Sequence, residues 1–122
     1  MRFFKSFKYA MSGIKYCAVS EKNFRTQLAI AIITFLAGMA FKISVSEWFA
    51  VLFCCALVLG LEMINTAIEK LGDMVTKTIN PVIKQVKDIA AGAVLLASVI
   101  SFITGGIIFF PKLTLLIKYF IK

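Results

Sequence analysis

The sequence predicts an all-α integral membrane protein with three transmembrane helices and an amphipathic helix before them. Two observations carry this prediction: 61% of the 122 residues are hydrophobic, and they gather in three long apolar stretches. A soluble globular domain of this length is far less apolar. The three stretches are Leu28 to Phe41, Trp48 to Leu61 and Ile89 to Phe110. We therefore expect a single membrane domain over residues 1–122.

Residues 1–19 are expected to form a helix that lies in the membrane interface. Their apolar side chains fall on one helical face and their lysines on the other, which is typical of a helix sunk into the headgroup region. Anchoring is the simpler interpretation, and contact with a substrate is the alternative. The transmembrane helices are expected at about residues 26–45, 48–70 and 87–110.

The lengths of the stretches place a polar group near the membrane boundary. Ile89 to Phe110 rises about 33 Å as a helix, enough to cross a hydrocarbon core of about 30 Å. Each of the two earlier stretches reaches only about 21 Å and must borrow flanking residues. The first can extend to Val45 because the stem of Lys42 can snorkel, whereas the second can extend only by carrying Glu62 towards the boundary. Glu62 is therefore expected to be half immersed.

Two local signals organise the second half of the chain. Asn80-Pro81 is a turn signal that ends the second transmembrane helix before a new helix begins. In the third span, small residues recur every four positions, at Ala93, Ala97, Ser101 and Gly105. Such a ridge lets helices approach closely, so we expect it to be a packing surface.

The basic residues indicate the orientation of the chain. With a cytoplasmic amino terminus, ten of the 14 Lys and Arg residues lie inside and four lie outside. This excess follows the positive-inside rule. We therefore expect a multi-pass membrane protein with its amino terminus in the cytoplasm and with no nucleic-acid partner.

A polar stripe begins where the second apolar stretch ends. Its four residues have helical spacing: Glu62, Asn65, Glu69 and Asp73. They fall within about 80° of arc on a helix, and apolar residues cover the opposite side. An ionisable group at mid-bilayer costs about 2.5 to 3.5 kcal/mol on insertion scales, so this acidic stripe beside the hydrocarbon indicates a functional site.

The chemistry of the acidic stripe suits a divalent cation. Mg²⁺ fits best, because it prefers one or two carboxylates together with phosphate oxygens and water. Lys87 and Asp88 arrive at the same membrane level, and a lysine beside the stripe suggests a Mg-nucleotide at the inner surface. The sequence has no P-loop and no histidine, which excludes an imidazole base. Alternatively, the stripe only forms ion pairs across helices, with Lys15, Lys22, Arg25 or Lys87.

The order of the residues resembles that of a known family. Residues 62–73 carry the pattern E-x-x-N-[ST]-A-I-E-x-x-x-D, and residues 87–90 carry K-D-x-[AG]. By this combination the chain closely resembles the bacterial membrane diacylglycerol kinase family, which also includes the undecaprenol kinases. The resemblance implies a homotrimer with three spans per subunit, located in the bacterial cytoplasmic (inner) membrane. It also implies active sites between protomers near the cytoplasmic membrane face, where the γ-phosphate of ATP is transferred to the primary hydroxyl of a lipid.

The resemblance implies a role for each polar residue. Glu62 matches the general base, and a base beside the hydrocarbon can reach a lipid alcohol. Glu69 and Glu21 match two carboxylates that coordinate Mg²⁺, although a favourable charge at a helix start is an alternative role for Glu21. The positions around the nucleotide match Asn65, Asp73, Lys87, Asp88, Arg2 and Tyr9.

The contacts to the lipid are expected near the start of the first span. Asn23 and Arg25 are the candidate substrate contacts there. Members of the family with an additional acid in this region tend to use diacylglycerol, whereas this chain has Gln27, which favours undecaprenol. The alternatives to a kinase are a small oligomeric channel or carrier and a non-catalytic membrane subunit. Because the polar residues cluster at one membrane face, a continuous pore is disfavoured.

Overall fold

The computed structural model describes residues 2–122, which form four helices. They are α1 (Arg2–Ser20), α2 (Lys22–Phe41), α3 (Val45–Val75) and α4 (Pro81–Ile121). Residues 2–122 contain no strand, and α2, α3 and α4 are each long and apolar enough to cross a membrane. The predicted all-α class and the three candidate membrane spans are thereby confirmed.

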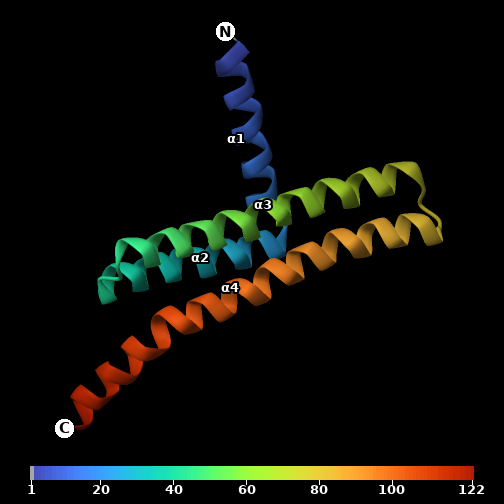
Figure 1. Cartoon of the computed structure of the whole chain (residues 1–122). Helices are drawn as coiled ribbons and strands as arrows, with labels where there is room; N and C mark the ends of the chain where they lie inside the picture. Colours follow the sequence, from blue (N-terminus) through green and yellow to red (C-terminus); the bar gives the residue numbers. More distant parts are fainter. Residues whose placement is uncertain (1) are drawn as a thin grey trace.

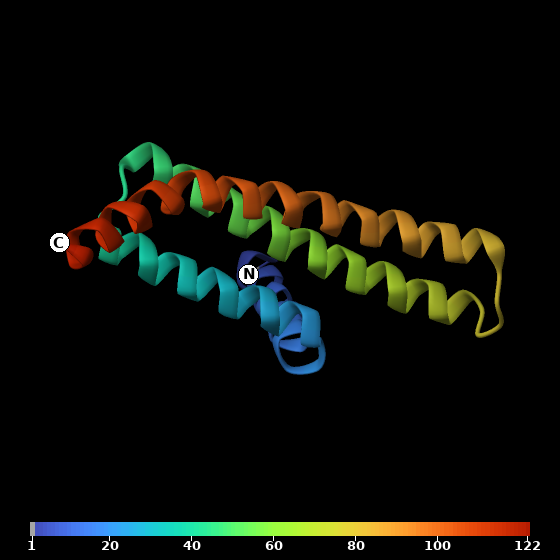
Figure 2. The ribbon, with the colours of Figure 1, turned by 90° about the horizontal axis from the view of Figure 1, so that it is seen from below.

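The three long helices run side by side, and α1 projects from the side of their bundle (Figure 1, Figure 2). α3 packs against both α2 and α4. With 20 residues, α2 is about 30 Å long and matches the hydrocarbon core, whereas α3 and α4 have 31 and 41 residues. As a result, the α3–α4 hairpin extends past the start of α2 at the end that carries the connection 76–80 (Figure 1).

The turn between α2 and α3 comes earlier in the chain than the sequence suggested. α2 ends at Phe41 because Lys42 adopts the left-handed conformation, with φ at 52°. Ser44 then caps α3: its hydroxyl accepts a hydrogen bond from the Glu47 N–H at 3.2 Å, and Glu47 Oε1 accepts one from the Ser44 N–H at 2.9 Å. The expected continuation of the first span to Val45 is therefore wrong, and Val45 is the first residue of α3.

The other predicted turn is present. α3 ends at Val75 and α4 starts at Pro81, after Asn80. Asn80 Oδ1 accepts hydrogen bonds from the N–H groups of Val82 and Ile83, at 2.9 and 3.2 Å. Proline is compatible with the first helical position because its missing N–H would have no partner inside the helix. The Asn80-Pro81 signal therefore marks a helix start as well as a turn.

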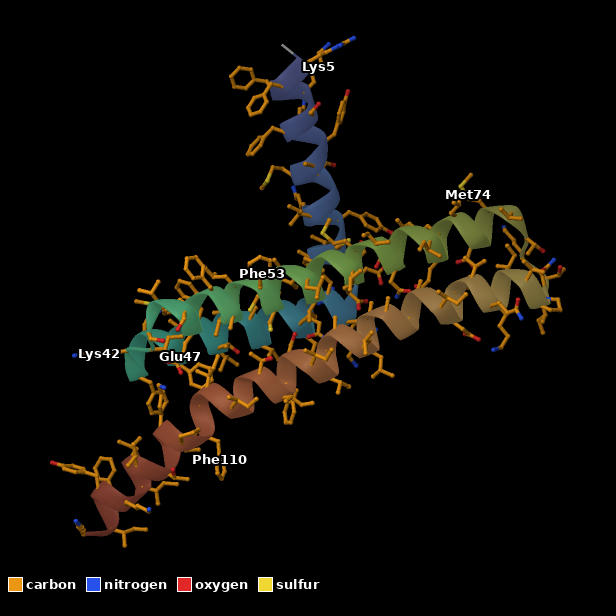
Figure 3. The ribbon with its side chains drawn as sticks, viewed as in Figure 1. Lys5, Lys42, Glu47, Phe53, Met74 and Phe110 are labelled. Atoms are coloured by element: carbon orange, nitrogen blue, oxygen red, sulfur yellow. The ribbon has the colours of Figure 1, made fainter. Side chains whose placement is uncertain are left out.

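A small apolar core joins the three long helices at the end of the bundle that carries the α2–α3 turn. Its buried residues are Ile43, Val51 and Ile108, and Phe109 is among the side chains packed against them. At this end Lys112 Nζ also lies 3.0 Å from Glu47 Oε2, and both side chains are partly exposed. Figure 3 places Glu47 and Lys42 at this end and Met74 at the opposite end. We call the two ends the Glu47 end and the Met74 end.

Candidate functional site

The acidic stripe begins where α1, α2 and α3 meet. Glu62 lies on α3 and is only 4% exposed. Its carboxylate is close enough to those of Glu69 and Glu21 to interact with their charges. Glu21 is the N-cap residue of α2, but its side chain makes no capping hydrogen bond. The start of α2 thus brings a second carboxylate to the level of Glu62.

Cys17 lies near the carboxylates of Glu21 and Glu62. This thiol belongs to the last turn of α1 and is 5% exposed. Burial, together with the charges of Glu21 and Glu62, raises the pKa of the Cys17 thiol. The end of α1, the start of α2 and the middle of α3 therefore form one cluster.

Asn65 and Glu69 continue the stripe along α3. The Asn65 side-chain amide donates from Nδ2 to Glu69 Oε1 at 3.2 Å, although Asn65 itself is only 7% exposed. Asn65 Oδ1 is buried and has no hydrogen-bond partner within residues 2–122. A buried oxygen left without a partner costs about 1–3 kcal/mol, so Oδ1 is a candidate to accept from a ligand or to coordinate a cation.

The alternative in which the stripe only forms ion pairs holds for one residue. Lys87 Nζ lies 2.5 Å from Asp73 Oδ1, which joins α4 to the last turns of α3. In the part of the chain that the structure describes, no basic side chain is within ion-pair distance of Glu62 or Glu69. Because a buried carboxylate without a counter-ion is costly, Glu62 is not explained as a structural ion pair.

Gly72 fixes the path of Lys87, which sequence reasoning did not detect. A Cβ on Gly72 would lie 3.0 Å from Lys87 Cε and 3.2 Å from Ile83 Cγ2. The stem of Lys87 therefore crosses α3 directly over Gly72 and carries its ammonium group to Asp73. No sequence signal identifies this contact, because it depends on how α4 lies against α3.

The carboxylates of one chain are not a preformed metal cage. Within residues 2–122, no group of three His, Cys, Asp or Glu side chains is arranged to hold a metal ion. The donor set nevertheless fits Mg²⁺, which takes oxygen ligands and usually completes its shell with phosphate oxygens and water. The unpartnered Asn65 Oδ1 supports this fit. Glu69 and Glu21 would hold the cation when the nucleotide brings it.

Several predicted residues lie apart from the acidic stripe in this chain. Arg2 and Tyr9 are exposed on α1, which points away from the bundle, and Figure 3 shows Lys5 near the free end of this helix. Asn23 is exposed at the start of α2. Arg25 donates from Nη1 to the Val19 carbonyl at 2.7 Å, so it stabilises the α1–α2 turn. Their predicted contacts with nucleotide and lipid stay predictions.

Two further contacts help to place the site. Lys70 Nζ lies 4.5 Å from the centre of the Tyr16 ring, a cation–π contact that ties α3 to α1. Lys84 Nζ lies 2.6 Å from Asp88 Oδ2, one turn apart on the exposed surface of α4. Neither pairing was predicted. Asp88 therefore lies on the exposed surface of the α3–α4 hairpin and already pairs with Lys84.

Comparison with known proteins identifies the family to which this chain belongs. Residues 8–109 match the family model described as prokaryotic diacylglycerol kinase. The chain is 42% identical over 112 residues to the undecaprenol kinase of Bacillus subtilis, covering 92% of this chain and 91% of that protein. It is 37% identical over 111 residues to a diacylglycerol kinase of Synechocystis, covering 88% of this chain and 62% of that protein. A diacylglycerol kinase of Helicobacter pylori is 30% identical over 95 residues, 78% of this chain and 74% of that protein. The chain therefore belongs to the prokaryotic diacylglycerol kinase family.

Proposed function

We propose that this protein transfers the γ-phosphate of ATP to the hydroxyl group of a membrane lipid at the cytoplasmic membrane face. Family membership supports an ATP-dependent lipid kinase that spans the membrane. The observation that carries the proposal is Glu62, a buried carboxylate with no basic partner among residues 2–122. Its position at the start of the acidic stripe, next to an apolar span, suits a base that acts on a lipid alcohol.

The residues of the stripe and the polar residues near it have separate roles in the proposed phosphoryl transfer. Glu62 takes the proton from the attacking hydroxyl. Glu69 and Glu21 would hold Mg²⁺, which would neutralise negative charge on the transferred phosphate. Lys87 exchanges its Asp73 partner for a phosphate oxygen, because its ammonium group is already at the hairpin surface. Asn65 orients the nucleotide through its unpartnered oxygen, and Asp88 lies at the edge of the same nucleotide site.

The position of α1 supports an assembly of several copies. Arg2 and Tyr9 are exposed on α1, and this helix projects from the bundle of its own chain (Figure 1). As nucleotide contacts they therefore act on the site of a neighbouring protomer. We propose that this assembly is the homotrimer that the family resemblance implies, with the amino terminus of each chain in the cytoplasm.

Undecaprenol is the acceptor that we propose. The undecaprenol kinase of Bacillus subtilis is 42% identical and matches nearly end to end, whereas the diacylglycerol kinases are 37% and 30% identical over smaller shares of both chains. Gln27 supports the same choice, because an acid is absent from this part of α2. Asn23 and Arg25 lie close to the expected headgroup level.

Acceptor competition tests this proposal. The purified protein in mixed micelles is given radiolabelled ATP, Mg²⁺ and equimolar undecaprenol and diacylglycerol. We expect most of the label in undecaprenyl phosphate. Label mainly in phosphatidic acid would overturn the choice of acceptor, and label in neither product from an intact oligomer would overturn the kinase itself.

A further inference from the structure

A groove lies between the three long helices, within the membrane-spanning part of the bundle. Its volume is about 500 Å³. α3 forms the floor, and α2 and α4 form the walls. Along α4 the lining extends from Ser98 to Phe109, about 16 Å of helix. This depth is about half of a hydrocarbon core, and the volume is typical of a ligand site.

One end of the groove lies beside Glu62. Val58 and Leu59 line the groove and precede Glu62 by four and three residues, which places all three on neighbouring positions of one face of α3. Gln27 lines the groove from α2, about 9 Å of helix beyond Glu21. The groove therefore leads from the proposed catalytic carboxylates into the membrane.

The other end of the groove reaches the apolar core at the Glu47 end. Val51 and Phe109 belong both to its lining and to the apolar core at the Glu47 end. The Phe41 and Phe109 rings stand edge to face there, with centres 6.1 Å apart. A hydrocarbon chain that enters beside Glu62 therefore meets aliphatic and aromatic side chains at the far end of the groove.

The lining offers few polar groups to a ligand. Thr34 and Thr104 donate to the carbonyls of Ile30 and Ile100 in their own helices, at 2.8 and 2.9 Å. Ser98 Oγ is buried without a partner among residues 2–122. The small-residue ridge explains the open space, because Ser101 and Gly105 line the groove instead of closing onto α3.

We propose that this groove holds one hydrocarbon chain of the lipid alcohol while its hydroxyl lies at Glu62. The inference rests on the proposed kinase activity and adds a specificity determinant to it. A single-chain acceptor such as a polyprenol places the first part of its chain in the groove, whereas a two-chain lipid must leave one chain outside. The groove thereby favours the acceptor with one chain.

Filling the groove tests the proposal. Gly105 lines the groove and a Cβ there meets nothing within 4 Å, so the side chain of Gly105→Leu takes up part of the groove. Gly92→Leu is the matched control, because Gly92 lies on the same helix, also has open space and does not line the groove. Excluding about two methylene groups corresponds to about a tenfold loss of affinity. We expect KM for undecaprenol to rise about tenfold in Gly105→Leu, with KM for ATP unchanged, and neither to change in Gly92→Leu.

A binding readout separates this inference from the kinase proposal. A prenol that carries a photoreactive diazirine in its chain should label residues 98–109 in the wild type and in Gly92→Leu but not in Gly105→Leu. Labelling outside the groove, or equal labelling of all three proteins, would overturn the inference even if the kinase is active. If no lipid is phosphorylated but the labelling follows the expected pattern, the kinase proposal fails and the groove still binds hydrocarbon.

Two outcomes would assign the groove to another occupant. Dissociation of the oligomer in Gly105→Leu, with Gly92→Leu intact, would show that a second copy fills it. Ser98→Ala removes the unpartnered hydroxyl, so a hydrocarbon occupant predicts an unchanged or lower KM for undecaprenol. A severalfold higher KM in Ser98→Ala would instead show a polar occupant and overturn the proposal.

Discussion

The Gly72→Ala substitution should impair the use of ATP more than it affects stability. The added Cβ would lie 3.0 Å from Lys87 Cε, so the lysine must move by a few tenths of an ångström. This movement is easy for the flexible end of a long side chain. Alanine gains about 0.8–1.0 kcal/mol over glycine inside a helix, and overpacking against Ile83 costs about 1–3 kcal/mol. The net change in the free energy of unfolding should therefore be a destabilisation of no more than about 2 kcal/mol.

The effect on nucleotide binding follows from the displaced ammonium group. A hydrogen bond to a charged group contributes about 1.5–3 kcal/mol, and the loss of about half of this raises KM for ATP by about fourfold to twelvefold. The assay is initial velocity at varied ATP and saturating lipid, together with a denaturation midpoint. Gly60→Ala on the same helix is the control, because a Cβ there meets nothing within 4 Å. An equal KM for ATP in the two variants would refute the assignment of Lys87.

Three other perturbations test separate parts of the molecule. Lys112→Met removes the ion pair with Glu47 and should lower stability by about 1 kcal/mol or less, with KM for ATP unchanged; a large change in that KM would show that the two ends of the bundle are coupled. Chelation of divalent metal should abolish phosphate transfer and added Mg²⁺ should restore it, so transfer that persists in chelator argues against metal ligation by Glu21 and Glu69. Because the pKa of Cys17 is raised, less of it is thiolate at neutral pH than for an ordinary thiol, and its alkylation should be slow and accelerate as pH rises. Glu62→Gln removes one of the charges responsible and should speed the alkylation at neutral pH; an unchanged rate would contradict the proximity of the two side chains.

The fold was largely predictable because apolar length is a direct requirement of the bilayer. The three spans and the Asn80-Pro81 boundary follow from stretch length and local turn chemistry. The end of α2 was not predictable in this way. Snorkelling was assumed to carry the helix through Lys42, but the capping box at Ser44 and Glu47 starts the next helix there. A helix that continues through Lys42 and a new helix that starts after Ser44 have the same hydropathy, so hydropathy does not distinguish them.

The candidate site was predictable where it depends on one helix. Helical spacing alone places Glu62, Asn65 and Glu69 on one face of α3, and the Asn65–Glu69 hydrogen bond reflects that spacing. Features that depend on the packing of different helices were not predictable. Two such features are the packing of the Lys87 stem over Gly72 and the groove beside the small-residue ridge. The ridge was expected to close a helix interface, but at Ser101 and Gly105 it leaves space.

The most direct test of the central claim compares the loss of two carboxylates on α3, one in the middle of the helix and one in its first turn. Glu62→Gln and Glu47→Gln remove the same charge with almost no change in volume, and glutamine can still complete the capping box at Ser44. Transfer of radiolabel from ATP to undecaprenol is measured on oligomers of equal size. We expect Glu62→Gln to lower turnover by about a hundredfold or more, as for the loss of a general base, and Glu47→Gln to stay near the wild-type rate. Turnover near the wild-type rate in Glu62→Gln would contradict the claim that this buried carboxylate performs the chemistry.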